Sequence, residues 1–274
     1  MAGDQGVDRM LTALFACLAL GLVAGLLAGL LGVGGGLVIV PGLLFVFHLI
    51  GLPEAHQQHL ALGTSLATIV FTSIASFRAH AAHGAVRWPV FRSIAPGIVI
   101  GTFVGAQLAG LFSGIALKWF FVVFAYLVGA QMLADFKPKP SRGLPGTLGM
   151  GGVGTVIGAV SSWVGIGGGS LSVPFMTLCN VPVREAIGTS AAIGLPIAAA
   201  GALGYVVSGW GAFELPAGSA GFVYLPALAG IVIASFPMAK VGARLAHRLP
   251  VAVLKKCFAA LLIVLATKML ISLI

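Results

Sequence analysis

The stretch GLLGVGGGLVIVP, residues 29–41, decides the fold of this chain, and it returns as WVGIGGGSLSVP at residues 163–174. In both copies a long apolar run ends in glycines and resumes with a short apolar segment that contains a Val-Pro pair. Consecutive glycines admit backbone angles that other residues rarely adopt, and a proline removes one N–H from a helical ladder. Unwound backbone at membrane depth is tolerated only where protein or a water-filled cavity covers it. We therefore expect two interrupted membrane segments, a pattern typical of the substrate site of secondary transporters.

The composition places the chain in a lipid bilayer. Of its 274 residues, 59% are hydrophobic and 8% are charged, and the mean hydropathy is +1.12. A soluble domain carries about 25% charged residues. The net charge of +9 comes from bases spread over short connecting segments, which is the pattern of membrane orientation signals. We expect an integral membrane protein whose partner is the bilayer, with no nucleic-acid partner.

Five apolar segments are expected in each half. They are residues 10–31, 37–52, 60–77, 93–112 and 116–134, and then residues 147–164, 171–181, 189–207, 222–245 and 251–274. The segment after each glycine run is shorter than the ~20 residues that a spanning helix needs. The predicted fold class is an all-α integral membrane protein with eight to ten transmembrane helices. In each half, the first pair of segments would form a broken or re-entrant hairpin.

The two halves also align outside the glycine runs. The matched positions are Gly32 with Gly165, Pro41 with Pro174, Gly63-Thr64-Ser65 with Gly188-Thr189-Ser190, and Gly105-Ala106 with Gly242-Ala243. Self-similarity over most of a chain indicates an internal duplication. We therefore divide the chain into a first membrane repeat (10–135), a cytoplasmic linker (136–146) and a second membrane repeat (147–274).

The basic residues predict the orientation in the membrane. If the linker with Lys137, Lys139 and Arg142 is cytoplasmic, alternation of the segments puts most of the 15 lysines and arginines on the cytoplasmic side. An odd number of segments in each half then makes the two repeats inverted with respect to each other. Inverted repeats are the architecture of many alternating-access carriers.

Glycines at helical spacing predict where helices pack closely. Gly21, Gly25 and Gly29 recur every four residues, as do Gly97, Gly101 and Gly105. Small residues at this spacing let two helix backbones approach each other. We expect packing seams at these glycines and assign them no role in binding.

The polar groups left at membrane depth are neutral donors. All six acidic residues lie at segment ends or in loops, whereas proton relays and cation pumps carry carboxylates inside the membrane. Bare N–H groups at a helix N-terminus favour an anion, and hydroxyl groups add further donors. The candidate substrate-binding residues are Gly34, Gly35, Gly36, Thr64, Ser65, Gly167, Gly168, Gly169, Thr189, Ser190 and Arg78, with Pro41 and Pro174 as hinge or helix-break positions.

Other readings of the same residues remain open. A membrane hydroxyl often bonds back to its own helix, and Arg78 could be a topology anchor that snorkels to the interface. The pairs His56/His59 and His80/His83 have a spacing that could bind a metal in a membrane enzyme, but no further ligand completes either shell. A non-transporting membrane scaffold is a third alternative. We expect no catalytic residue, metal or cofactor.

The duplicated glycine–proline motif, the Gly-Thr-Ser that opens the next helix and the inverted halves resemble the sulfite exporter TauE/SafE family, also known as DUF81. The resemblance covers roughly residues 10–274. It implies a multi-pass carrier in the plasma (inner) membrane of a prokaryote that moves a small sulfur-containing anion such as sulfite, thiosulfate or an organosulfonate. The resemblance does not decide the coupling ion, for which H⁺ and Na⁺ are the candidates. The family motif carries over to Gly34, Gly35, Gly36 and Pro41, and to Gly167, Gly168, Gly169 and Pro174.

Overall fold

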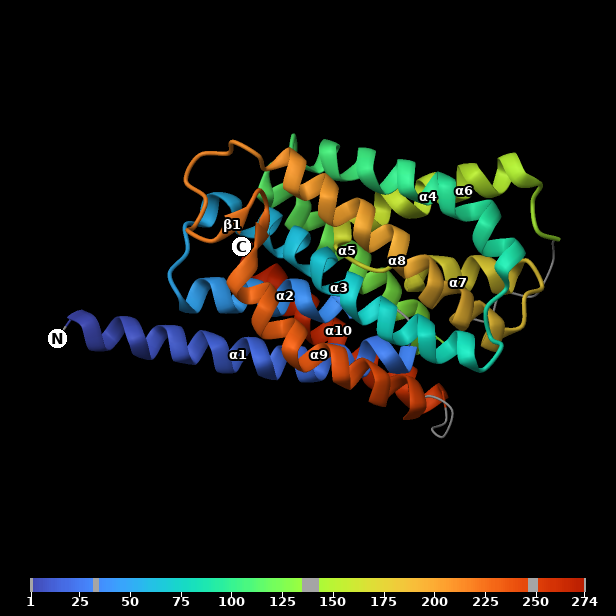
Figure 1. Cartoon of the computed structure of the whole chain (residues 1–274), viewed down its shortest axis with the longest axis horizontal. Coiled ribbons are helices and arrows are strands. Elements are labelled where there is room, and N and C mark those ends of the chain that lie inside the picture. The colour runs from blue at the N-terminus through green and yellow to red at the C-terminus, as the bar shows by residue number, and fades with distance from the viewer. Residues whose placement is uncertain (1, 32–34, 135–142, 246–250, 274) are drawn as a thin grey trace.

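The computed structural model describes residues 2–31, 35–134, 143–245 and 251–273. Within them the regular secondary structure is helical apart from one pair of two-residue strands (Figure 1). The elements are α1 (Ala2–Leu31), α2 (Gly36–Leu49), the 3₁₀ helix η1 (Glu54–His56), α3 (Gln57–Ala82), α4 (Trp88–Ala109), α5 (Gly114–Leu133), α6 (Thr147–Val164), α7 (Gly169–Leu178), α8 (Val183–Ser208), β1 (Ser219–Ala220), β2 (Val223–Tyr224), α9 (Leu225–Leu245) and α10 (Val251–Ile271). Gly34 and the linker bases Lys137, Lys139 and Arg142 lie outside the described residues.

Seven helices in the described ranges are long and apolar enough to cross a membrane. These stretches are Leu11–Leu30, Glu54–Ala82, Trp88–Ala109, Gly114–Leu133, Thr147–Val164, Val183–Ser208 and Leu225–Leu245. By contrast, α2 and α7 have 14 and 10 residues, too few to span a bilayer. The expectation of an all-α, multi-pass membrane protein is confirmed.

Several boundaries differ from those expected: α1, α4 and α8 begin earlier, at Ala2, Trp88 and Val183, and the bounds of α3 and α9 also differ. Helix α3 extends beyond the apolar stretch 60–77, because it buries Gln57, Gln58 and His59 at one end and His80 at the other. The expected bounds followed the apolar run, so they excluded these polar residues although the structure buries them. Helix α9 begins at Leu225 rather than at residue 222, because the preceding residues pair β1 with β2 in an antiparallel hairpin.

Helices α3 and α8 form the centre of the molecule. They pack against each other, and neighbouring helices cover both of them (Figure 1). The apolar window of α3 is 78% buried and that of α8 is 56% buried, whereas the corresponding windows of α1, α5, α6 and α9 are at most 39% buried. A helix covered on all sides can carry polar groups away from lipid, so α3 and α8 are where a polar site can be built.

The outer helices pack in pairs, each made of one helix from the first half and one from the second half. Helix α1 lies along α9 and helix α4 lies along α6. A Cβ added to Gly25 would overlap the backbone of Ser235, and one added to Gly101 would overlap the backbone of Thr155. The packing seams predicted from the four-residue glycine spacing are therefore confirmed.

Candidate functional site

Both broken segments begin their second helix with the same backbone conformation. Gly35 precedes α2 with φ 76° and ψ −7°, and Gly168 precedes α7 with φ 77° and ψ −7°. This left-handed conformation costs an L-residue with a side chain roughly 1–2 kcal/mol. The turn that starts each short helix therefore favours glycine at position 35 and at position 168. Helices α2 and α7 continue through Pro41 and Pro174. Both segments therefore break at the glycines and not at the prolines. The hinge role of the prolines stays a prediction.

The break in the second half lies directly against the first half. A Cβ on Gly36, the first residue of α2, would overlap the carbonyl oxygen of Gly165. The Ser65 hydroxyl donates a hydrogen bond of 2.8 Å to that same carbonyl oxygen. Gly165 itself ends α6 with φ 73°. The structure thus brings together Gly36, Ser65 and the second glycine run, which are far apart in the sequence.

Residues of α8 enclose the other side of the second break. Gly168 packs against the Ile197 side chain, and the carbonyl oxygen of Gly167 lies 3.3 Å from the point where a Cβ of Gly194 would stand. Ser172 of α7 donates a 3.0 Å hydrogen bond to Ser190. Gly167, Gly168 and Gly169 are all buried. The run is therefore covered by protein, as unwound backbone at membrane depth must be.

The two threonines of the Gly-Thr-Ser motif hold the connecting segments of the opposite half. Thr64 Oγ1 accepts a 2.9 Å hydrogen bond from the Tyr224 N–H, and Thr189 Oγ1 accepts one of the same length from the Arg87 N–H. The glycine before each threonine contacts the same opposing segment, since a Cβ there would overlap a carbonyl oxygen. Each hydroxyl therefore has its oxygen engaged and retains one hydrogen to donate.

Two serine hydroxyls beside the second break have no hydrogen-bond partner among the described residues. Ser161 is 0% exposed and Ser170 is 5% exposed. Ser161 Oγ lies 3.5 Å from the position that a Cβ of Gly168 would occupy, so it faces the left-handed turn. A buried hydroxyl without a partner is rare and costly in folded proteins. In the sequence, a Ser-Ser pair precedes the second glycine run and a Ser-x-Ser pattern follows it. These serines could have been predicted as donors, but of the hydroxyl groups only those of the duplicated Gly-Thr-Ser motif were predicted to bind.

Known proteins show the same chain pattern. The family model described as "Sulfite exporter TauE/SafE" matches residues 17–269. The chain belongs to the TauE/SafE family. A Haemophilus influenzae relative named "Probable membrane transporter protein" is 40% identical over 95% of this chain and 99% of its own length. Relatives with similar names from Bacillus subtilis and Methanocaldococcus jannaschii are 30% and 28% identical, over 69% and 67% of this chain and 77% and 68% of their own lengths.

In this TauE/SafE protein, Arg78 lies near the end of α3, five residues beyond Ser73, which adjoins the second break. It is exposed on α3, thirteen residues beyond Ser65, which corresponds to about 20 Å along a helix. It lies near the end of α3 at which Arg87 forms a 2.9 Å ion pair with Glu185. A role of Arg78 in binding the anion stays a prediction.

His59, the second histidine of the pair at the start of α3, contacts backbone carbonyls through its ring. His59 Nε2 lies 3.1 Å from the Ala109 carbonyl and 3.2 Å from the Phe112 carbonyl. Its ring packs on Phe222 at 4.9 Å between centroids, and the His56 ring is 6.2 Å away. No group of three or more potential metal ligands occurs within the described part of the chain.

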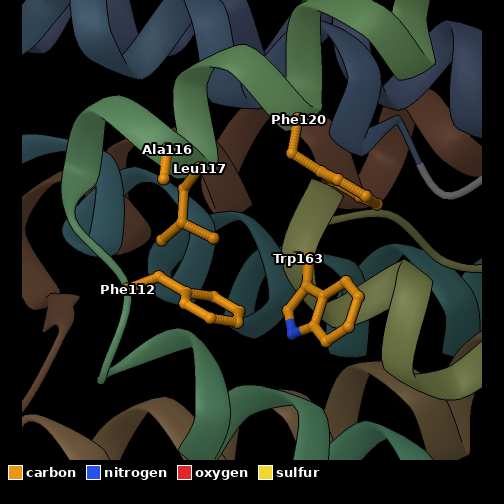
Figure 2. A pocket seen from close by; sticks show the side chains of 5 residues that line it. All are labelled: Phe112, Ala116, Leu117, Phe120 and Trp163. Atoms are coloured by element: carbon orange, nitrogen blue, oxygen red, sulfur yellow. The ribbon is translucent and has the colours of Figure 1, made fainter.

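A separate pocket of about 230 Å³ lies between the start of α5 and the end of α6. Figure 2 shows its lining, which consists of Phe112, Ala116, Leu117, Phe120 and Trp163. The indole N–H of Trp163 donates to the Gly105 carbonyl at 2.9 Å, so the ring presents carbon to the pocket. The side chains that line this pocket therefore offer an anion no hydrogen-bond donor.

Proposed function

We propose that this protein is a secondary carrier that exports a small sulfur-containing anion, such as sulfite, thiosulfate or an organosulfonate, across the plasma membrane of a prokaryote. The observation that carries the proposal is the meeting of the two halves at Gly36 and Gly165, beside the unpartnered hydroxyls of Ser161 and Ser170. Membership of a family described as sulfite exporters supports the substrate class. The names of the relatives, which are probable membrane transporters, support transport as the activity.

The chemistry of this region suits an oxyanion. The N-terminus of α7 and the N–H groups of its glycine run carry partial positive charge, and an anion needs no further counter-charge to be stabilised there. Ser161 and Ser170 would each donate one hydrogen bond to the anion, which would satisfy both buried hydroxyls. Thr64, Ser65, Thr189 and Ser190 line the adjoining helices α3 and α8, and Gly35 and Gly36 supply the corresponding turn of the first half.

Alternating access would follow from inverted repeats. The cross pairing of α1 with α9 and of α4 with α6 supports two interlocked halves, as do the matched contacts of Thr64 with Tyr224 and of Thr189 with Arg87. Rocking of one half against the other would expose the anion to each side in turn, with Pro41 and Pro174 as hinges. H⁺ or Na⁺ would be the coupling ion. Arg78 would attract anions to the end of the bundle, and no covalent chemistry is required.

Flux measurements in proteoliposomes test the proposal. Purified protein is reconstituted into liposomes that are loaded with sulfite, thiosulfate, a short alkylsulfonate or acetate. The efflux of each anion is compared with its efflux from protein-free liposomes. We expect flux of at least one sulfur-containing anion, and a strong reduction in the Gly168→Val variant after its insertion and monodispersity have been verified. Flux of none of these anions, or undiminished flux in well-folded Gly168→Val, would contradict the proposal.

A further inference from the structure

Helix α3 carries a buried polar face that runs from the central region to one end of the bundle. Thr64, Thr68, Thr72, Ser76 and His80 follow one another at intervals of four residues, and each is at most 3% exposed. Residues four apart lie next to each other on a helix, but each step turns the direction of the side chain by about 40°. The five side chains therefore form a stripe that winds almost half a turn around α3 between Thr64 and His80, and we call these residues the α3 polar face.

The matching face of α8 is apolar beyond its first residue. Aligning the duplicated Gly-Thr-Ser motifs pairs the α3 polar face with Thr189, Ile193, Ile197, Gly201 and Tyr205, all of them buried. On α8, isoleucine, glycine and tyrosine therefore fill the buried positions at which α3 carries hydroxyl groups and an imidazole. Because burying polar groups costs free energy, packing alone does not account for the α3 polar face.

One hydroxyl of this face has no partner within the described residues. Thr68 and Thr72 bond back to carbonyls of their own helix, at 2.9 and 3.3 Å, but Ser76 Oγ makes no hydrogen bond although it is buried. On the same helix, Ser73 Oγ lies 2.9 Å from the point where a Cβ of Gly194 would stand, next to the Gly167 carbonyl. The polar surface of α3 is therefore continuous with the second glycine break.

Helices α3 and α8 run antiparallel, since Gly63 lies against Tyr205 and Gly194 lies against Ser73, so the parts that follow the second break lead in opposite directions. Helix α3 runs from the break towards Arg78 and the Arg87–Glu185 ion pair, the basic end of the bundle. Along α8, Ile197 packs on Gly168, and the Tyr205 hydroxyl donates to the Ser162 carbonyl at 3.1 Å. That end is closed by apolar side chains and by a tyrosine whose hydroxyl is already bonded.

We propose that the α3 polar face is the wall of the passage along which the anion moves between the central site and the basic end, and that the matching α8 face is the hydrophobic seal of the opposite side. Hydroxyl dipoles along such a wall replace part of the hydration shell that an anion loses. An apolar wall offers no such compensation, so water and ions are kept out. This inference rests on the proposed function for the identity of the solute, but not for the asymmetry of the two faces.

Cysteine accessibility tests the asymmetry directly. The exposed Cys257 is first replaced by serine, which leaves only the buried Cys17 and Cys179. Thr72→Cys and Ser76→Cys are then compared with Ile193→Cys and Ile197→Cys, their matched controls on α8. Vesicles of both orientations are treated with a membrane-impermeant thiosulfonate reagent, and the thermal stability of each variant is verified.

We expect both α3 cysteines to react from the basic side about tenfold faster than either α8 cysteine does from any side, because access governs thiol reactivity. Equal rates for Ser76→Cys and Ile197→Cys, or no reaction of either α3 cysteine, would overturn the inference. Slowing of the α3 reaction by a short alkylsulfonate, which does not itself react with the thiosulfonate reagent, supports both the passage and the proposed function. Reaction of the α3 cysteines that no tested anion slows upholds the asymmetric passage and counts against the proposed substrate class.

Discussion

The hydroxyl oxygen of Thr64 accepts a hydrogen bond from the backbone N–H of Tyr224, 160 residues further along the chain. The corresponding bond in the other half joins Thr189 to Arg87. These two bonds tie the start of each central helix to the segment that precedes a helix of the opposite half. The interface between the halves is therefore held by a pair of equivalent contacts.

Removing either acceptor should destabilise the protein. We expect Thr64→Val to lower the free energy of unfolding by about 1–3 kcal/mol, because the Tyr224 N–H loses its acceptor. Thr189→Val should have an effect of the same size through Arg87. Thermal unfolding in detergent measures both, and Thr64→Ser, which keeps the hydroxyl, is the control. A valine variant as stable as the serine variant would show that this bond contributes nothing.

The two unpartnered serines should behave in the opposite way. Ser161→Ala and Ser170→Ala remove hydroxyls that have no hydrogen-bond partner among the described residues, so we expect stability to be unchanged or raised. Affinity for the anion should fall about tenfold in each variant, because one hydrogen bond to the anion is lost. Anion-dependent thermal stabilisation gives both quantities from one titration. Ser162→Ala is the control, since the Ser162 hydroxyl already donates to the Ala159 carbonyl. Unchanged affinity in both variants would remove these serines from the site.

The contact between Gly36 and Gly165 leaves no room for a side chain. We expect Gly36→Ala to cost at least about 1–3 kcal/mol, because the added Cβ would overlap the Gly165 carbonyl and backbone would have to move. Gly152→Ala is a matched control within α6, since Gly152 is exposed and a Cβ there would meet no atom within 4 Å. Equal thermal stabilities of the two variants would show that the breaks do not meet as described.

Arg78 should affect capture of the anion rather than its binding at the centre. Because Arg78 is exposed, we expect Arg78→Gln to raise the KM of transport several-fold at low ionic strength, and the difference should disappear at high salt. Arg92→Gln, an exposed arginine on the adjoining α4, is the control for general loss of charge. A KM that does not change with salt in either variant would favour the alternative role of Arg78 as a topology anchor.

Much of this architecture could be predicted from sequence patterns. The glycine spacing of α1 and α4 predicted seams that the contacts of Gly25 and Gly101 confirm, because close backbone approach requires small residues at fixed intervals. The motif glycines pointed to turns that only glycine adopts easily, as the φ of Gly168 bears out. Both signals are local, and they depend on residue type and spacing alone.

The partners of individual hydroxyls could not be predicted in this way. Thr64 and Ser65 are adjacent in sequence, but one bonds to Tyr224 and the other to Gly165. Which hydroxyls remain without a partner, as Ser161 does, depends on how the two halves pack. The full length of α3 was likewise hidden, because His59 and His80 are buried by neighbouring helices rather than by their own hydropathy.

The most direct test of a shared anion site is to locate a bound anion. Crystals of the protein grown with selenite, an analogue of sulfite that scatters anomalously, would be measured at the selenium absorption edge. We predict one anomalous peak within hydrogen-bonding distance of Ser161 and Ser170, beside the turn at Gly168. A peak elsewhere in the bundle, or none at saturating selenite in protein that transports sulfite, would contradict the account.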